Sequence, residues 1–390
     1  MIKIQIDPIS RKVLSYTRVR KNTQIYSTDI LLEDSEIPDI RTPYMYVDGQ
    51  FVEITDENYD HTLEDMNAEI AGLSEVDDGR FFVKLVMEGK SLSAARTETS
   101  ARKERREELH QRRAAFLEER KQKTEKHYRE ENKKIDDALQ NQFYSAVILL
   151  IKHENRYLQE WIDWHLALGF DHMYIYDNGT AEKVTEVTEQ YDSAVQEKIT
   201  VIDWSGHHNH IQQDAYNHFM EHFRTDTRWG LFIDSDEFLR FTDGITTNIN
   251  EFLKNYEDYT EVWGYEVEYN ANGQEYYEDA PVRERFTKQV DTREGFYWKN
   301  FIQVNRIDSF LMHYAYYDER KHLMFKNEQS NQDLFVIDHY YTKSWEEWQW
   351  KIKERGGADP RYHKALKEFF LYNPELKYLD TGENAHQAYE

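Results

Sequence analysis

The sequence predicts an α/β protein whose main domain is built on a mostly parallel, Rossmann-like sheet. Strand-length apolar segments and helix-period segments alternate four times between residues 145 and 236. The strand segments are continuous apolar runs, as is typical of strands covered on both faces. Alternation of this kind produces parallel strands joined by right-handed helical crossovers.

The elements of this domain follow from their periodicity. A helix is predicted from Tyr157 to Gly169, because aromatic and apolar residues recur at helical spacing and the glycine ends them. The first four predicted strands are 146–151, 173–176, 199–204 and 229–233, with a helix over 215–223 before the fourth. The pattern beyond Asp236 is less regular, with strands predicted at 263–269, 301–304 and 335–337 and helices at 345–352 and 364–371.

Two further regions precede the main domain, which we assign to residues 143–390. Residues 1–90 are expected to form a small β-rich module, in which Asp48-Gly49 predicts a hairpin turn. Residues 91–142 are highly charged and contain no Gly or Pro, which predicts a long helical linker. The sparse apolar residues of segment 96–139 fit either a coiled-coil seam, through which the chain would form a homo-oligomer, or a solvated spacer helix.

The composition argues against several classes of protein. There are 49 Lys and Arg against 74 Asp and Glu, and the net charge of -25 opposes binding to nucleic acid or to anionic membranes. The absence of cysteine excludes disulfides, Cys-ligated zinc and thiol catalysis, and it agrees with a reducing compartment. No apolar run reaches the roughly 18 residues of a membrane span, and the N-terminus has no signal-peptide pattern, so we expect a cytoplasmic protein.

The segment Asp234-Ser235-Asp236-Glu237 is the strongest candidate for chemistry. It follows the apolar run 229–233, and alternation along a strand would place both aspartates on one face. Two hard oxygen ligands at the end of a parallel strand suit a divalent cation that bridges a diphosphate. Glu154 and Asp177 follow earlier strands and should converge on the same edge of the sheet. The alternative for each of these residues is an ordinary polar turn.

These residues resemble the GT-A glycosyltransferases of the family 2-like and family 92-like groups. The resemblance covers roughly residues 145–380, and the family usually has Asn where this chain has His153. The matching segments are Ile151 to Gly169, Tyr174 to Thr180, Gln213 with Ala215, Phe232 to Leu239, Lys299, His313, and His339-Tyr340 with Lys343-Ser344, Lys351 and Arg355-Gly356.

The resemblance implies an enzyme that moves a sugar from a nucleotide-sugar donor, with a UDP-sugar favoured, to a glycan, protein or other hydroxyl acceptor. Asp234 and Asp236 would hold Mn²⁺ or Mg²⁺. A C-terminal histidine would be the third ligand, and by order and distance His339 is favoured over His313. The residues expected to bind the donor are Glu154 and Asp177 at the nucleoside, Lys299 at phosphate and Trp263 at the sugar.

An enzyme that inverts the anomeric centre also needs a general base on the acceptor side. Glu278 or Asp279 would serve, with Glu237 and Glu268 as competitors. Two other functions stay open: a non-catalytic carbohydrate-binding or phage-tail-associated structural protein, and a metal-dependent phosphoesterase. The intact acidic segment argues against the first, and the second leaves Glu160-Trp161 unexplained.

Overall fold

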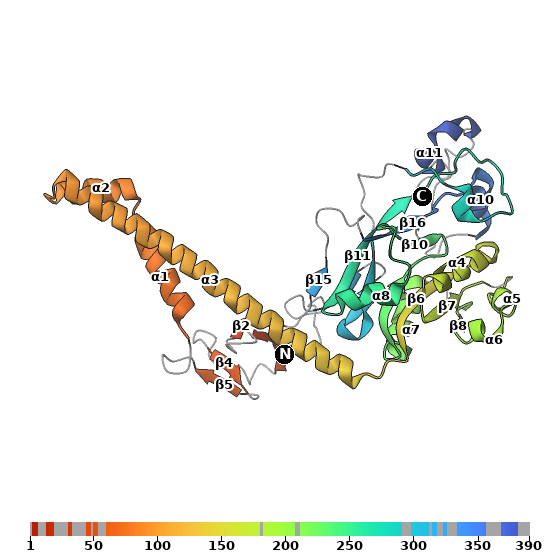
Figure 1. The fold of residues 1–390 in the computed structure, drawn as a ribbon, viewed down its shortest axis with the longest axis horizontal. Helices are drawn as coiled ribbons and strands as arrows, with labels where there is room; N and C mark the ends of the chain where they lie inside the picture. The colour runs from red at the N-terminus through yellow and green to blue at the C-terminus, as the bar shows by residue number, and fades with distance from the viewer. Residues whose placement is uncertain are drawn as a thin grey trace. The chain divides into compact units, whose positions relative to one another are not determined.

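The computed structural model divides the chain into two compact units, Met1–Lys133 and Lys134–Glu390 (Figure 1). The residues that it describes are 2–6, 13–18, 30–32, 44–47, 50–53, 60–179, 182–206, 211–290, 298–311, 314–317, 323–325, 334–355 and 368–380. No helix in these ranges is both long enough and apolar enough to cross a membrane.

The first unit begins with short antiparallel strands. β1 (Ile2–Ile6) pairs with β2 (Val13–Arg18) and with β3 (Ile30–Leu32), and β4 (Tyr44–Val47) pairs with β5 (Gln50–Glu53). Val47 lies opposite Gln50, so two residues connect β4 and β5 and the predicted hairpin is confirmed. The Asp48-Gly49 turn itself lies outside the described residues.

The prediction of a β-rich module over residues 1–90 is wrong for residues 62–74 and 78–87, which are helical. α1 (Thr62–Ser74) and α2 (Asp78–Met87) are helices, and they lead into α3 (Leu92–Ala138). A helix cap and ion pairs with α3 stabilise the helical form of these segments. The side chain of Asp77 accepts a hydrogen bond from Arg80 N at the start of α2, and Arg106 of α3 binds Asp78 at 2.8 Å. The 47 residues of α3 confirm the long charged helix, while self-association through 96–139 stays a prediction.

The second unit is built on a nine-stranded sheet. Its order is β10-β16-β11-β12-β9-β6-β7-β8, and β15 (Leu323–Phe325) pairs with β11 beside this path. The strands are β6 (Phe143–Ile151), β7 (His172–Asp177), β8 (Ile199–Asp203), β9 (Thr227–Phe232), β10 (Glu237–Phe241), β11 (Tyr259–Glu268), β12 (Trp298–Gln303) and β16 (Phe335–His339). Five of the eight described pairings are parallel, so the predicted α/β class with a mostly parallel sheet is confirmed.

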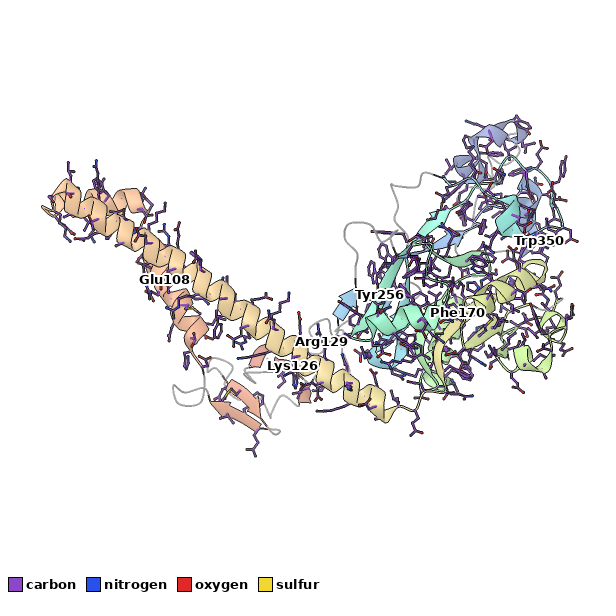
Figure 2. All side chains as sticks on the ribbon, viewed as in Figure 1. Glu108, Lys126, Arg129, Phe170, Tyr256 and Trp350 are labelled. Atoms are coloured by element: carbon purple, nitrogen blue, oxygen red, sulfur yellow. The ribbon has the colours of Figure 1, made fainter. Side chains whose placement is uncertain are left out.

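Helices cover both faces of the central strands. Along β6, Val147 packs into a buried cluster with Trp161 of α4 (Asn155–Ala167), and the next residue, Ile148, packs into a second cluster with Phe219 of α7 (Ile211–His222). Figure 2 shows this dense side-chain packing, with Phe170 of the first cluster labelled. The helices of the unit are α4 (Asn155–Ala167), α5 (Thr185–Thr188), α6 (Ser193–Gln196), α7 (Ile211–His222), α8 (Ile249–Leu253), α9 (Val282–Arg285), α10 (Trp345–Trp350) and α11 (Phe369–Tyr372). Burial on both faces explains why these strands are continuous apolar runs.

Candidate functional site

The site lies where the strand order of the parallel half reverses. β7 and β8 follow β6 on one side, whereas β9 lies on its other side. Ligands of such sheets bind beyond the carboxyl ends of the strands at this reversal. Glu154 follows β6 and Ser235 follows β9, and the Ser235 hydroxyl donates a hydrogen bond to the Glu154 carboxylate. The two strand ends therefore meet, with Glu154 buried in the contact.

The acidic segment is a turn and not the end of a strand. β9 ends at Phe232, and Glu237 N donates to Asp234 O at 3.1 Å. The Glu237 carboxylate in turn accepts a hydrogen bond from Asp234 N at 2.9 Å. The expectation that strand alternation sets the direction of Asp234 and Asp236 is therefore wrong, because a tight turn intervenes before β10.

Strand register gathers the other ionisable groups on one face of the sheet. Glu237 of β10 is opposite His339 of β16, and His339 is opposite Glu268 of β11. Residues directly opposite project from the same face, and so does Glu266, two residues before Glu268. Lys299 reaches this group from β12, with its ammonium 3.0 Å from Glu237 Oε2. Residues from four strands thus form one cluster.

The two ring nitrogens of His339 face different carboxylates. Nε2 lies 3.8 Å from Asp236 Oδ1. Nδ1 lies 3.2 Å from Glu266 Oε2, without the alignment of a hydrogen bond, and 4.0 Å from Glu268 Oε1. Burial by itself would lower the pKa of His339, but the Glu266 and Asp236 carboxylates raise that pKa to about 9. The ring is therefore a cation when no metal is bound to it.

Two buried lysines hold Asp236. Lys351 Nζ lies 2.7 Å from Asp236 Oδ2, and Lys343 Nζ lies 3.6 Å from the same oxygen. Burial opposes ionisation, but the two ammonium groups and His339 keep the pKa of Asp236 well below its usual value. Lys343 adopts a φ of 52°, in the left-handed region that a lysine rarely occupies. The backbone is therefore constrained at the residue that delivers one of these cations.

Lys299 balances the opposite side of the cluster. Besides Glu237, it lies 4.0 Å from Asp234 Oδ2, and its side chain is buried. Burial and the neighbouring carboxylates raise the pKa of Glu237 to about 8, against the pull of Lys299. The same carboxylates keep the pKa of Lys299 above its usual value despite burial. Asp234 is the most open member, with 39% of its side chain exposed, and Gln212 donates to it at 3.0 Å.

Carboxylates outnumber cations in this cluster. The carboxyl groups are Glu154, Asp234, Asp236, Glu237, Glu266 and Glu268, of which Glu237 is neutral near pH 7 because of its raised pKa, and the cations are Lys299, Lys343, Lys351 and the protonated His339. Excess buried negative charge is costly, and a divalent cation would offset it. Donor atoms of Glu237, Glu266 and His339 all lie within 4.8 Å of one another. The cluster therefore fits an ion such as Mn²⁺ or Mg²⁺, for which oxygen and imidazole are suitable ligands.

Asp177 is used to build the turn that follows β7. Its Oδ1 accepts a hydrogen bond from Gly179 N at 2.9 Å, and its Oδ2 accepts one from Val184 N at 3.0 Å. Both oxygens are therefore engaged by backbone, as in the turn alternative. Asp203, at the end of β8, likewise accepts a hydrogen bond from Ser205 N.

Trp263 lies away from the cluster. On β11 it is opposite Asn300, whereas its neighbour Gly264 is opposite Lys299. Because successive residues of a strand face opposite sides, Trp263 projects from the face that Lys299 does not use. Its ring stacks on Trp298, with the ring centroids 4.7 Å apart.

The proposed bases lie on a surface loop. Glu278 and Asp279 are exposed, and Tyr277 OH donates to Asp279 Oδ1 at 3.4 Å. Tyr277 N also donates to Glu346 Oε2 at 2.8 Å, which ties the loop to α10. His313, the less favoured third ligand, lies outside the described residues.

Glu266 and Glu268 were not assigned to a metal from the sequence, although a signal was present. Two glutamates at alternate positions near the end of a largely buried strand are expensive unless something compensates them. Their partner, His339, is distant in sequence and meets them only through the pairing of β11 with β16. Lys343 and Lys351 belonged to the family resemblance but had no assigned role.

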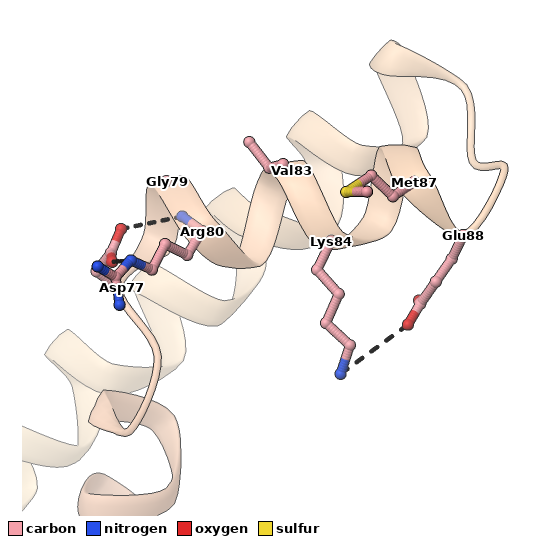
Figure 3. A pocket seen from close by; sticks show the side chains of 7 residues that line it. All are labelled: Asp77, Gly79, Arg80, Val83, Lys84, Met87 and Glu88. Carbon is pink, nitrogen blue, oxygen red and sulfur yellow. Dashed lines mark hydrogen bonds and ion pairs between the residues drawn. The ribbon is translucent and has the colours of Figure 1, made fainter.

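A separate hollow of about 560 Å³ lies on the surface of α2 in the first unit (Figure 3). Its lining is Asp77, Gly79, Arg80, Val83, Lys84, Met87 and Glu88. All seven come from one short stretch of chain, and Met87 is 83% exposed. The hollow is open helix surface, with the ordinary ion pairs Arg80–Asp77 and Lys84–Glu88.

Comparison with known proteins identifies the family. The family model described as Glycosyltransferase family 92 matches residues 150–368. A family 92 protein of Oryza sativa subsp. japonica is 24% identical over 213 residues, which are 54% of this chain and 35% of that protein. One from Ricinus communis is 23% identical over 216 residues, which are 54% of this chain and 37% of that protein.

The chain thus spans about a third of the length of these curated relatives. Among solved structures, S. aureus TarS 1-349 in complex with UDP-GlcNAc aligns with 62% of this chain and 69% of its own, at 12% identity and a TM-score of 0.31. The family model matches more than half of the sequence, as the resemblance of the acidic and C-terminal segments implied. The chain belongs to glycosyltransferase family 92.

Proposed function

We propose that this chain is a cation-dependent glycosyltransferase, which moves a sugar from a nucleotide-sugar donor, with a UDP-sugar as first choice, to a hydroxyl of a glycan or protein. Family membership supports the transfer reaction. The observation that carries the donor and cation is the carboxylate-rich cluster around His339, which Lys343 joins to Glu154 at the reversal of strand order.

The residues that would hold a divalent cation are His339 and three nearby carboxylates: Asp236 beside Nε2, Glu266 beside Nδ1, and Glu237. When bound, the ion supplies positive charge against the charge that develops on a departing diphosphate. Asp234 is the exposed carboxylate at the edge of this group and is the member that a donor reaches most readily.

The other residues prepare the site. Glu154 accepts a hydrogen bond from the Ser235 hydroxyl and so stabilises the turn between β9 and β10. Lys299 keeps positive charge beside Asp234 and Glu237. For an inverting reaction the base must accept the acceptor's hydroxyl proton, and Glu278 or Asp279 is our choice because the loop exposes them to an incoming acceptor.

The test is donor turnover by the full chain. Purified protein is incubated with a panel of nucleotide sugars, in Mn²⁺ or in EDTA, and release of nucleoside diphosphate is measured together with the mass of any glycosylated product. Turnover in Mn²⁺ should fall by about a hundredfold or more in His339→Gln, since metal-site electrostatics of this kind typically contribute that much.

Asp203→Asn is the matched control, because this carboxylate also ends a strand of the sheet but its side chain is 74% exposed. It should turn over at the wild-type rate. If no nucleotide sugar binds or reacts in either condition, the proposed function is wrong. Equal rates in Mn²⁺ and in EDTA would refute the cation requirement alone.

A further inference from the structure

We propose that His218 and His222 of α7 form a Zn²⁺ site at the surface of the second unit, separate from the carboxylate cluster around His339. The two histidines occupy positions i and i+4 of the helix, so their side chains lie on one face of it. This is the spacing by which a helix presents two imidazoles to a single zinc ion. Imidazole nitrogens suit Zn²⁺, whereas Mn²⁺ and Mg²⁺ prefer carboxylate oxygens.

The two rings of the pair are already in contact. Their centroids are 4.1 Å apart, and their planes differ by 17°. His222 is exposed and His218 is half-buried, so an ion can reach the pair from solvent. Two ligands that the helix holds side by side lose little conformational freedom when an ion joins them.

The Nδ1 atoms of both rings are engaged by the fold, as is usual in ligating histidines. His222 Nδ1 lies 3.0 Å from the carbonyl oxygen of His218. A carbonyl can only accept, so Nδ1 carries the proton and the lone pair of the neutral ring is on Nε2. His218 Nδ1 lies 3.0 Å from the Tyr176 hydroxyl, which can accept the Nδ1 proton when Nε2 binds an ion. Such partners fix the tautomer and the direction of a ligating ring.

His218 is the fixed member of the pair. Its ring meets the ring of Tyr176, a buried residue of β7, edge-on at 5.7 Å, and that of Trp204, which is also buried, at 5.1 Å. These contacts leave one orientation for the half-buried imidazole. The exposed His222 side chain is the member that adjusts to the ion.

The position in the helix also favours a cation. His222 is the last residue of α7, where the unsatisfied carbonyls of a helix carry partial negative charge. At the other end of α7, Gln212 donates to Asp234 at 3.0 Å. At a rise of about 1.5 Å per residue, His222 lies about 15 Å farther along the axis than Gln212. An ion that joins two turns there would stabilise the helix that carries Gln212, without taking part in sugar transfer.

The experiment measures binding of Zn²⁺ to the metal-stripped full chain by isothermal titration. The reference protein carries His339→Gln, so that the carboxylate cluster has no imidazole with which to compete. Adding His218→Gln or His222→Gln should each raise the Kd by about tenfold or more, because a single imidazole lacks the effective concentration that a second ligand provides. Adding both should weaken binding little more than either one does, since the two ligands act as a unit.

His110→Gln, in the same reference protein, is the matched control. His110 is an exposed histidine of α3, and the residues at i−4 and i+4 are Arg106 and Ala114, so it has no second imidazole at helical spacing. Its Kd should equal that of the reference protein. Thermal unfolding without metal verifies that each variant is folded. Zn²⁺ should raise the melting temperature of the reference protein more than that of the His222→Gln variant.

The inference is wrong if His222→Gln binds Zn²⁺ as tightly as the reference protein does. It is also wrong if the free-energy losses of the two single substitutions add in the double variant, because the histidines would then bind ions separately. Absence of Zn²⁺ binding to the reference protein would refute it as well. None of these results bears on the donor-turnover assay, which is run in Mn²⁺ with both proposed Zn²⁺ ligands and His339 intact.

Discussion

Two aspartates of the second unit, Asp136 and Asp236, are buried among cations, yet their surroundings differ in charge balance. Asp136, near the end of α3, accepts hydrogen bonds from Arg306 and from Arg228, the latter at 3.3 Å. Arg306 also donates a hydrogen bond to the backbone oxygen of Tyr259 at 3.3 Å, so another of its nitrogens is paired with a neutral group. Lys343, Lys351 and His339 likewise contact Asp236, but the cluster to which they belong contains more carboxylates than cations.

Asp136 therefore belongs to a structural ion pair, whereas the cluster that contains Asp236 is incomplete without a ligand. A carboxylate matched to guanidinium groups lowers the cost of burial and stabilises the fold. An excess of carboxylates does the opposite until an ion binds, and such imbalance is typical of functional sites. Removing a carboxylate should therefore have opposite effects on stability in the two regions.

The largest effect is expected at Asp136. Asp136→Ala leaves Arg306, whose side chain is 3% exposed, as an uncompensated buried cation. Breaking a buried pair from one side costs about 3–5 kcal/mol, so the free energy of unfolding of the second unit should fall by that order. Urea denaturation measures it.

Asp137→Ala is the control for this change, because Asp137 is the next residue of α3 and is exposed. Its effect should stay within about 0.5 kcal/mol. Mn²⁺ affinity should be unchanged in Asp136→Ala as long as the protein is folded. Equal destabilisation by both substitutions would remove the distinction between the two regions.

A smaller effect of opposite sign is expected at Glu268. Burial raises the pKa of this carboxyl, so its ionised form is disfavoured in the folded state. In EDTA, Glu268→Gln should increase the free energy of unfolding by about 1 kcal/mol, since the buried negative charge of this carboxylate is removed. With saturating Mn²⁺ the wild type should gain stability and the variant should gain less. If Glu268→Gln were less stable than the wild type in EDTA, the cluster would not contain a destabilising excess of carboxylates.

The smallest effect is expected in the pH dependence of stability at a second charge-balanced pair, Arg285 and Glu347. Glu347 receives hydrogen bonds from Arg285, Ser344 and Tyr157, and these outweigh burial and hold its pKa below its usual value. A depressed carboxyl pKa contributes stability above the unfolded value of about 4.5, and this contribution is lost as pH falls below it. The melting temperature of the wild type should therefore fall more steeply below this pH than that of Glu347→Gln. Parallel profiles would show that the pair contributes nothing.

Much of the second unit could be predicted because its strands and helices carry strong local periodicity. β10 was not predicted because it begins at Glu237, inside the acidic segment, and no continuous apolar run marks its start. The assignment of the acidic pair to one strand face failed because a hydrogen-bonded turn replaces the strand. α1 and α2 were missed because their helical form depends on a cap and on ion pairs with α3.

The site could be predicted only in part. Asp234, Asp236 and His339 were named from the motif and the family resemblance, and the structure brings them together with Lys299. The pairing of Asp136 with Arg306 spans 170 residues, and no local pattern encodes such a contact. The position of Glu266 likewise depends on strand register, which periodicity does not fix, and Lys343 and Lys351 reach Asp236 from the segments before and after α10.

The most direct test of the account is an anomalous-scattering map of crystals soaked with Mn²⁺ and a nucleoside diphosphate. We predict one Mn²⁺ peak beside His339, among the carboxylates of Asp236, Glu237 and Glu266. A map with the nucleoside diphosphate bound but no Mn²⁺ peak beside His339 would contradict it.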